Sequence, residues 1–233
     1  MGEALSLGAM CVNAGYAQNV IAIASSHFAS AEKQFRYPLE YGNQRPVAST
    51  WTVTGAGAYI VGDKPLDKKK CVLIKGITTG KIVDYGVKDS MNMGACMAPA
   101  AAELIEANFK DLDVDKDYYD AIFTGDLGEI GNRILSELLK EKGIDIADKL
   151  YDCGMLIYEG ETKCSGGSGC GCSASVLAGY ILPKIACGDW KRVLFVPTGA
   201  LMSKVSFSEG NSVPGIAQGV VLEWEEGEVE QTC

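Results

Sequence analysis

Two segments of this chain predict helices that have almost no polar face. In residues 1–17 only Glu3, Ser6 and Asn13 interrupt a run of apolar and small side chains, and residues 173–185 form a second run of the same kind. A helix that is apolar on every side must be covered on every side. Each of these helices is therefore expected in the middle layer of a layered domain, between two sheets.

The order of elements around these two helices is repeated. A small-residue helix, a tight turn and an apolar strand occur at residues 4–24 and again at 173–196, and a glycine-containing strand follows each copy, at 53–61 and 213–222. Two copies of one unit predict a pseudo-duplicated α/β fold, an α/β/α/β/α sandwich whose two apolar helices pair in the central layer.

The remaining patterns predict a mixture of strands, loops and helices. Strands are expected over 20–24, 51–61, 71–83 (with a turn at 79–81), 119–124, 192–196 and 216–224. Loops are expected over 91–98 and 155–158, and helices over 99–109, starting at Pro99, and over 132–142.

Charge and cysteine usage exclude several classes of function. The net charge of −9 argues against binding to nucleic acid, which requires basic patches. No apolar stretch is long enough to span a bilayer. The nine cysteines contain no C-x-x-C pair and the chain has one histidine, so we expect reduced, cytoplasmic thiols and neither a metal nor a cofactor.

A candidate binding site follows the apolar run at 20–24, which predicts a buried strand. Ser25, Ser26 and His27 come directly after this strand, and Arg36 follows nine residues past His27. Residues just beyond the carboxyl end of a strand in an α/β sheet face the crevice in which ligands bind. These residues predict a polar pocket for an anion. Alternatively, His27 ends the strand and Arg36 pairs with a local carboxylate.

Two glycine-rich loops, at 125–131 and 166–171, lead into predicted helices. Helix N-termini offer free backbone N–H groups to anions, so Gly167, Ser168 and Gly169 are candidate ligand-binding residues beside Ser26, His27 and Arg36. Tight turns with close packing are the alternative, which we favour for the first loop. Cys170 and Cys172 stand where a helix N-terminus lowers a thiol pKa, but neither has a base nearby in the sequence.

Several motifs resemble the stage V sporulation protein AD family of the thiolase and ketoacyl-synthase superfamily. They are Ser-Ser-His-Phe-Ala-Ser-Ala-Glu-Lys-Gln-Phe-Arg-Tyr-Pro at 25–38, Trp-Thr-Val-Thr-Gly-Ala-Gly-Ala-Tyr at 51–59, Met-Asn-Met-Gly-Ala-Cys-Met-Ala-Pro-Ala-Ala at 91–101, Thr-Gly-Asp-Leu-Gly at 124–128, Gly-Ser-Gly-Cys-Gly-Cys-Ser-Ala at 167–174 and Pro-Thr-Gly-Ala-Leu-Met-Ser at 197–203. These motifs extend over nearly the whole chain.

The resemblance implies a thiolase-like sporulation protein that binds dipicolinic acid, which is loaded into spores with calcium, and serves its uptake into the developing spore. It implies a homodimer that works with other proteins of the spore dipicolinate transport assembly. Its place would be cytoplasmic, peripheral to the inner spore membrane. Proteins of this family extend further at the N-terminus, so residues 1–110 would be the remainder of an N-terminal half and residues 111–233 the C-terminal half.

The resemblance also has a departure that bears on catalysis. Where condensing enzymes of the superfamily carry a histidine after the strand at 119–124, this sequence has Gly125-Asp126, and the loop at 166–172 replaces the second catalytic His or Asn. The nucleophile-bearing turn would lie just before Met1. These differences favour a binding protein over an enzyme. An acyl-transfer enzyme that uses Cys170 or Cys172, and a purely structural subunit of the assembly, are the alternatives.

Overall fold

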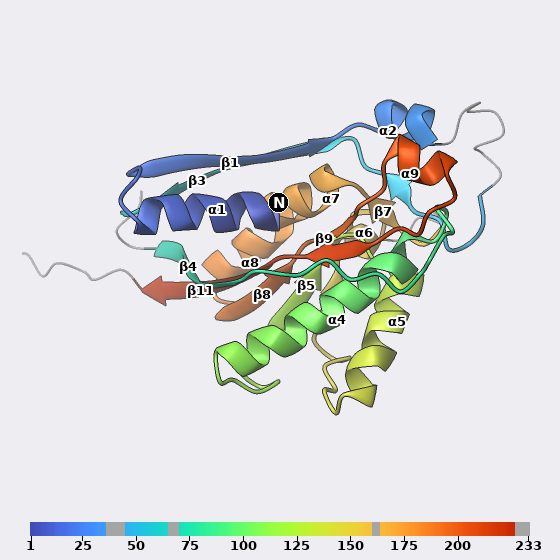
Figure 1. The fold of residues 1–233 in the computed structure, drawn as a ribbon. Helices are drawn as coiled ribbons and strands as arrows, with labels where there is room; N and C mark the ends of the chain where they lie inside the picture. The colour runs from blue at the N-terminus through green and yellow to red at the C-terminus, as the bar shows by residue number, and fades with distance from the viewer. Residues whose placement is uncertain (36–44, 65–69, 160–163, 227–233) are drawn as a thin grey trace, which may run out of the picture.

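The computed structural model of this protein describes residues 1–35, 45–64, 70–159 and 164–226, and these residues form four layers (Figure 1). The first layer is an antiparallel pair of strands, β1 (Asn19–Ser26) and β3 (Gly55–Gly62). The second holds α1 (Gly2–Asn13) and the helix that runs through α7 (Cys170–Val176), the π-helical turn η1 (Leu177–Ile181) and α8 (Leu182–Ala186). A five-stranded sheet and then α4 (Met93–Asp111) with α5 (Gly128–Glu141) complete the stack.

The five-stranded sheet is mixed, with the order β4-β11-β8-β5-β6. Its strands are β4 (Lys70–Thr78), β11 (Gly219–Glu226), β8 (Arg192–Val196), β5 (Ala121–Thr124) and β6 (Leu150–Asp152). Strand β5 runs parallel to β6 and β8, whereas β11 runs antiparallel to β8 and β4. All four residues of β5 are buried because helices cover both faces of the sheet.

The structure confirms the layered α/β fold and its internal repeat. Strand β3 pairs antiparallel with β1, and β11 pairs in the same way with β8, so the unit helix–strand–strand occurs twice. Helices α1 and α7 both contact β1 and β3, while α1 and α8 contact β11. Both apolar helices therefore lie between the two sheets, and the described residues supply four of the five predicted layers.

Two predictions about burial are wrong in part. Helix α1 ends at Asn13 and is not covered on every side, since the side chains of Leu7 and Met10 are 55% and 42% exposed. Strand β1 is not buried throughout, because only one of its faces packs on the helices and Ile21 and Ile23 point away from them.

The boundaries of two helices also differ from the prediction. Helix α4 begins at Met93, where the Asn92 side chain accepts a hydrogen bond from the N–H of Ala95 (3.3 Å), and Pro99 lies inside the helix. Helix α5 begins at Gly128 and includes Gly131, which packs against Gly94 of α4. A Cβ added to Gly131 would lie 2.6 Å from the Cα of Gly94, so the two helices touch through their backbones.

Shorter elements account for the other differences. The predicted loop at 155–158 belongs largely to a helix, α6 (Cys153–Ile157). The predicted strand at 51–61 divides into β2 (Trp51–Thr52) and β3, and the one at 216–224 divides into β10 (Gly215–Ala217) and β11. Strand β2 pairs with β7 (Gly167–Ser168), and β10 pairs with β9 (Thr198–Ala200). Two short helices, α2 (Phe28–Phe35) and α9 (Lys204–Ser208), lie at the same end of the molecule.

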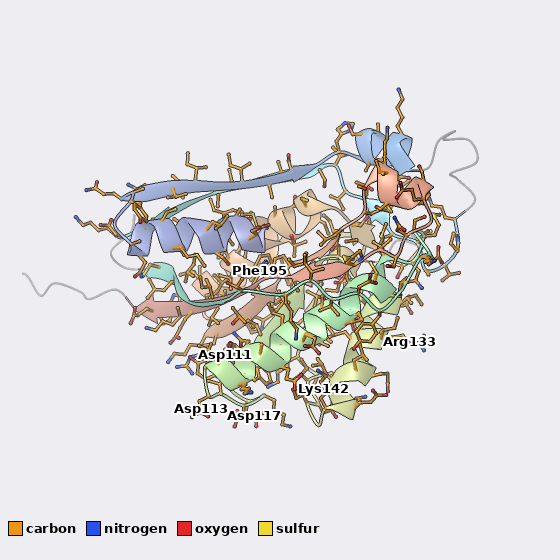
Figure 2. All side chains as sticks on the ribbon, viewed as in Figure 1. Asp111, Asp113, Asp117, Arg133, Lys142 and Phe195 are labelled. Carbon is orange, nitrogen blue, oxygen red and sulfur yellow. The ribbon has the colours of Figure 1, made fainter. Side chains whose placement is uncertain are left out.

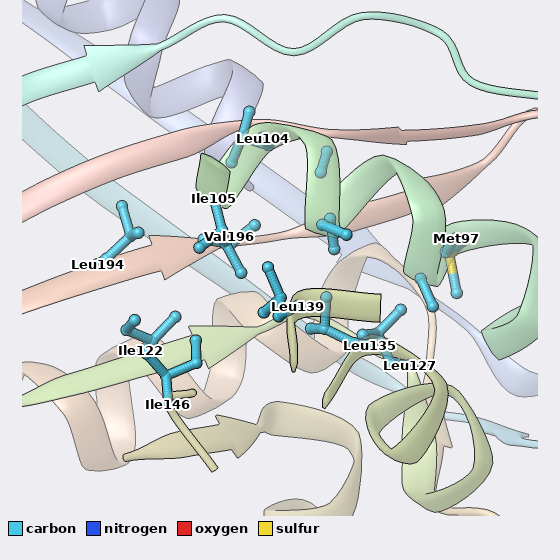
Figure 3. Packing of buried hydrophobic residues seen from close by; sticks show 14 of the residues in the cluster. Met97, Leu104, Ile105, Ile122, Leu127, Leu135, Leu139, Ile146, Leu194 and Val196 are labelled. Atoms are coloured by element: carbon cyan, nitrogen blue, oxygen red, sulfur yellow. The ribbon is translucent and has the colours of Figure 1, made fainter. Parts of the chain in front are cut away.

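The larger hydrophobic core lies between the five-stranded sheet and the helices α4 and α5 (Figure 3). Leu104 and Ile105 of α4 and Leu135 and Leu139 of α5 meet the sheet there. At the far end of α4, Asp111, Asp113 and Asp117 are exposed (Figure 2). Within the four described ranges, His, Cys, Asp and Glu side chains form no group able to hold a metal ion. None of the helices in those ranges has both the length and the apolarity of a membrane span.

Candidate functional site

The ends of several strands and the starts of α4 and α7 surround a cavity of ≈ 340 Å³, which we call the ligand cavity. It lies at the end of the molecule where β2, β7 and β9 meet. Its wall is formed by Ala31, Glu32, Thr50, Thr52, Ser90, Met93, Met97, Asp126, Ser168, Gly169, Cys170, Thr198, Gly199, Ala200 and Met202. Hydroxyl groups and apolar side chains dominate this surface.

The structure brings some of the predicted ligand-binding residues to this cavity. Ser168 and Gly169 belong to its wall. Ser26 lies beside them: its Oγ donates to the carbonyl of Val53 (2.7 Å) and accepts from the N–H of Gly171 (2.9 Å). Gly169 has φ +99°, and a Cβ there would lie 2.8 Å from the Ser26 Oγ, so this position requires glycine.

Gly167 and His27 do not belong to the wall. Gly167 is buried in β7 beside Val53 and Ile157. His27 is exposed, and its carbonyl accepts the N–H of Ala31 at the start of α2. Arg36 lies outside the described residues. Ligand binding by His27 and Arg36 stays a prediction.

Asp126 is the buried acid of the ligand cavity. It follows β5, its side chain is hydrogen-bonded on both oxygens, and the residue is only 9% exposed. The N–H of Gly169 donates to Oδ2 (2.9 Å) and the hydroxyl of Thr198 to Oδ1 (2.8 Å). Burial is the main cause that raises the pKa of Asp126 to about 6. The nearby Asp152 raises it further, and the hydrogen bonds and the amino group of Met1 oppose this shift.

A second buried acid, Asp152, holds the loop that carries Asp126. Its carboxylate accepts hydrogen bonds from the Thr124 hydroxyl and from the N–H groups of Leu127, Gly128 and Met155, at 2.7–3.1 Å. The side chain thereby caps α6 and fixes the first turn of α5. Burial raises the pKa of Asp152, which is 2% exposed. Asp152 therefore positions Asp126 and does not itself reach the ligand cavity.

A buried ion pair contributes Glu32 to the wall of the ligand cavity. Arg45 Nη2 lies 2.8 Å from Oε2 of Glu32, and the two side chains are 4% and 1% exposed. The guanidinium of Arg45 lies 4.0 Å from the ring centre of Trp51, which stacks on Phe28. The Thr52 hydroxyl donates to Oε1 of Glu32 (3.3 Å). This arrangement fastens α2 to β2 and neutralises the carboxylate that lines the cavity.

The two candidate thiols differ in their surroundings. Cys172 is fully buried, its thiol is 3.8 Å from the carbonyl of Gly125, and burial raises its pKa well above the usual value. Its sulfur therefore stays protonated and inert. Cys170 is exposed and belongs to the wall of the ligand cavity. The one histidine of the chain, His27, is not part of that wall.

A second cavity of ≈ 350 Å³ lies between the start of α5, strand β6, helix α6 and residues 164–166. Its wall includes Glu129, Asn132, Tyr151 and Glu159 and shares no residue with that of the ligand cavity. None of the predicted ligand-binding residues belongs to it.

Glu32, Thr52 and Thr198 are wall residues that were not predicted from the sequence. Glu32 and Thr52 fall within quoted motifs, but nothing in their spacing indicated that they meet. The sequence did indicate that the position of Asp126 is functional, because condensing enzymes of the superfamily have a histidine at the corresponding place. The sequence alone did not show that its carboxyl group is buried.

Comparisons with known proteins agree with this architecture. A sequence profile of the family "Stage V sporulation protein AD" matches residues 1–223. Stage V sporulation protein AD of Bacillus subtilis (strain 168) is 44% identical over 222 residues, which cover 95% of this chain and 64% of that protein. The chain thus spans less than two thirds of the length of this curated relative.

Solved structures of condensing enzymes share the fold. A tetronic acid condensing enzyme has a TM-score of 0.57 and 15% identity, over 95% of this chain and 64% of its own. The 3-oxoacyl-[acyl-carrier-protein] synthase III of Aquifex aeolicus VF5 has a TM-score of 0.50 and 15% identity, over 95% and 63%. A Xanthomonas campestris OleA variant bound with cerulenin has a TM-score of 0.51 and 12% identity, over 94% and 59%. These likenesses show a thiolase-like fold, and the sequence matches show that the chain belongs to the stage V sporulation protein AD family.

Proposed function

We propose that this sporulation protein binds dipicolinic acid without turning it over and serves the uptake of dipicolinate into the developing spore. Its partners would be other proteins of the spore dipicolinate transport assembly, at the cytoplasmic side of the inner spore membrane, and its active form a homodimer. The calcium chelate of dipicolinate is a candidate form of the ligand.

The observation that carries this proposal is the make-up of the ligand cavity. Its volume, ≈ 340 Å³, lies at the lower end of the range of roughly 300–1,000 Å³ for small-molecule pockets and suits a single substituted ring. Its wall offers the hydroxyl groups of Ser90 and Ser168, together with methionine side chains, while the hydroxyls of Thr52 and Thr198 already donate to Glu32 and Asp126. Hydroxyl donors suit carboxylates, and apolar side chains suit the faces of an aromatic ring.

Calorimetric titration with dipicolinate tests the proposal. We expect saturable binding that Ser168→Ala weakens about tenfold, because a hydrogen bond to a charged group is worth about 1.5 kcal/mol or more. The predicted roles of His27 and Arg36 imply losses of about ten- to a hundredfold on substitution by alanine. Ser212→Ala is the matched control, since Ser212 is not a wall residue and its hydroxyl donates to Asp84.

Two results would contradict the proposal. Absence of any binding heat, with and without calcium, would remove dipicolinate as the ligand. Equal affinity in Ser168→Ala and Ser212→Ala, with a loss only in the His27 or Arg36 variants, would place the ligand outside the cavity.

A second candidate function, acyl transfer, has one observation in its favour. The exposed thiol of Cys170 lies in the cavity wall, near the buried carboxyl of Asp126. Intact-mass measurement after incubation with acetyl-CoA tests this candidate, with Cys170→Ala as the control. A stable acetyl adduct on the unaltered chain that is absent from the Cys170→Ala variant would favour an enzyme over a binding protein.

A further inference from the structure

Any dicarboxylate that enters the ligand cavity meets the carboxyl group of Asp126. This residue belongs to the cavity wall and is 9% exposed, so little water reaches its oxygens. Each oxygen already accepts one hydrogen bond, from Gly169 or from Thr198. Neither donor carries a charge, so these bonds do not neutralise the carboxylate.

The charged groups around Asp126 offer little compensation. The amino group of Met1, at the start of α1, is the cation that acts on it, and burial lowers the pKa of that group. Asp152, which holds the same loop, is a second acid. Glu32, which also belongs to the cavity wall, is already paired with Arg45. Among the described wall residues there is no Lys, Arg or His.

Four cysteine thiols also lie near Asp126. Burial raises the pKa of Cys96 on α4 to about 12, and it raises the pKa values of Cys153 on α6 and Cys172 on α7 well above the usual value. These three thiols are therefore neutral near neutral pH. Cys170, the fourth, is exposed in the wall.

Two anionic partners in a water-poor cavity repel each other strongly unless a cation joins them. When carboxylates share such a site, one of them takes a proton. A protonated Asp126 would also gain one O–H group to donate to a ligand carboxylate, while its oxygens still accept from the Gly169 N–H and the Thr198 hydroxyl.

We propose, on the basis of the proposed function, that Asp126 enters the ligand complex as a neutral carboxylic acid, so that the cavity takes up one proton with each dicarboxylate that it binds. Asp126 would thus contribute to specificity. Its O–H favours ligands with a carboxylate, and its ionised form rejects them. Since burial raises the pKa of the free residue to about 6, binding near pH 7.5 requires a proton that the free protein largely lacks.

Calorimetry in buffers of different ionisation enthalpy measures this proton directly. At pH 7.5, in the presence of a chelator of divalent ions, we expect dipicolinate binding to take up close to one proton per ligand. Affinity should fall about tenfold for each pH unit between pH 7 and 8.5, as the linkage of one proton to one ligand requires. Dipicolinate is fully ionised in this range, so its own titration adds nothing.

Asp126→Asn supplies the matched variant. The amide can accept from Gly169 and donate to the ligand at any pH, so we expect proton uptake near zero and an affinity that no longer changes with pH. Asp84→Asn is the control, because Asp84 is an exposed acid outside the cavity wall and its loss should leave the uptake of one proton intact.

The outcomes separate this inference from the proposed function. Binding without proton uptake in the unaltered chain would overturn the inference and keep the function. Binding that requires added calcium and takes up no proton would overturn it as well, since the metal would then be the companion cation. Absence of all dipicolinate binding would overturn the proposed function, and this inference with it.

Discussion

At the scale of single residues, Asp126 has a measurable property even without ligand. Its pKa, raised by burial to about 6, lies above the usual value of about 3.9 for an unfolded chain. Between these two pH values the folded state binds more protons than the unfolded state, so stability falls as pH rises from 4 to 6. Above pH 6 the cost of the ionised carboxylate is present in full, and below pH 4 it is absent.

We therefore expect Asp126→Asn to stabilise the chain at pH 8 by about 3 kcal/mol, since the pKa is raised by about two units and each unit corresponds to about 1.4 kcal/mol. Urea unfolding at several pH values measures this gain, which should shrink as the pH is lowered from 7 to 5. Asp84→Asn is the control, because hydrogen bonds from Ser212 and Gly86 lower the pKa of Asp84 and its loss should bring no gain. A gain for Asp126→Asn that stays constant from pH 8 to 5 would contradict the assignment.

The same residues show how far a sequence predicts a site. Ser168 and Gly169 were predicted because a glycine-rich run before a helix is a local signal, and both belong to the cavity wall. Glu32 and Arg45 form a pair that depends on α2 packing against β2, which no local pattern encodes. The exposure of His27 depends on the turn into α2, so its chemistry could be predicted but its direction could not.

At the scale of elements, two glycines in helices predict opposite results for the same substitution. A Cβ on Gly131 of α5 would lie 2.6 Å from the Cα of Gly94, whereas nothing lies within 4 Å of a Cβ on Gly179 in η1. Gly131→Ala must force α4 and α5 apart, and we expect a loss of about 1–3 kcal/mol in the free energy of unfolding. Gly179→Ala should instead gain about 0.5–1 kcal/mol, because alanine restricts the unfolded chain and favours the helix.

Chemical denaturation of both variants checks this pair, with circular dichroism to confirm that each keeps its helices. Equal effects of the two substitutions would show that the backbones of α4 and α5 do not meet at Gly94 and Gly131.

Elements were predicted well where burial and local pattern agree. The strand at 192–196 was predicted with the bounds that the structure has, because β8 is a short apolar run between turn residues. The start of α4 was missed because Pro99 suggested a first turn, although Asn92 held the true capping signal. The run at 20–24 in β1 was predicted as a buried strand, and the prediction is wrong in part because an apolar run does not show how many faces of a strand meet another layer.

At the scale of the whole molecule, the outer face of the β1–β3 pair is apolar. Ile21 and Ile60 are directly opposite each other on neighbouring strands, and Ile23 follows on the same face. All three side chains are more than 60% exposed. A continuous exposed apolar surface promotes association, so we expect the chain to self-associate.

A triple variant, Ile21→Thr with Ile23→Thr and Ile60→Thr, should reduce this association while keeping the strands, because threonine favours β structure. Light scattering coupled to size exclusion, over a range of protein concentrations, measures the change. Val61→Thr is the control, since Val61 packs on the inner side against Gly8 and its loss should lower stability without relieving association. A monodisperse unaltered chain with a sharp cooperative melt would contradict the prediction.

The division of the chain into halves at residues 110 and 111 stays a prediction. Strand β4, from the first of these ranges, pairs with β11 from the second, and α4 packs on α5. A repeated sequence pattern shows the order of similar units along the chain. It does not show which strands of the two units pair in one sheet.

The order of strands in the main sheet has a consequence for synthesis on the ribosome. Strand β11 lies between β4 and β8, although it follows both of them in the chain, and within the described part of the sheet β4 pairs with β11 alone. While residues 79–218 are being synthesised, β11 does not yet exist. The backbone N–H and C=O groups of β4 that bond to β11 in the folded sheet therefore cannot form those hydrogen bonds. The sheet can close only after Glu226 has left the exit tunnel. Such distant pairing is slow and leaves a strand open to wrong partners in the meantime. During synthesis, correct folding therefore requires that the unpaired edge of β4 be protected from wrong strand partners until β11 has been made.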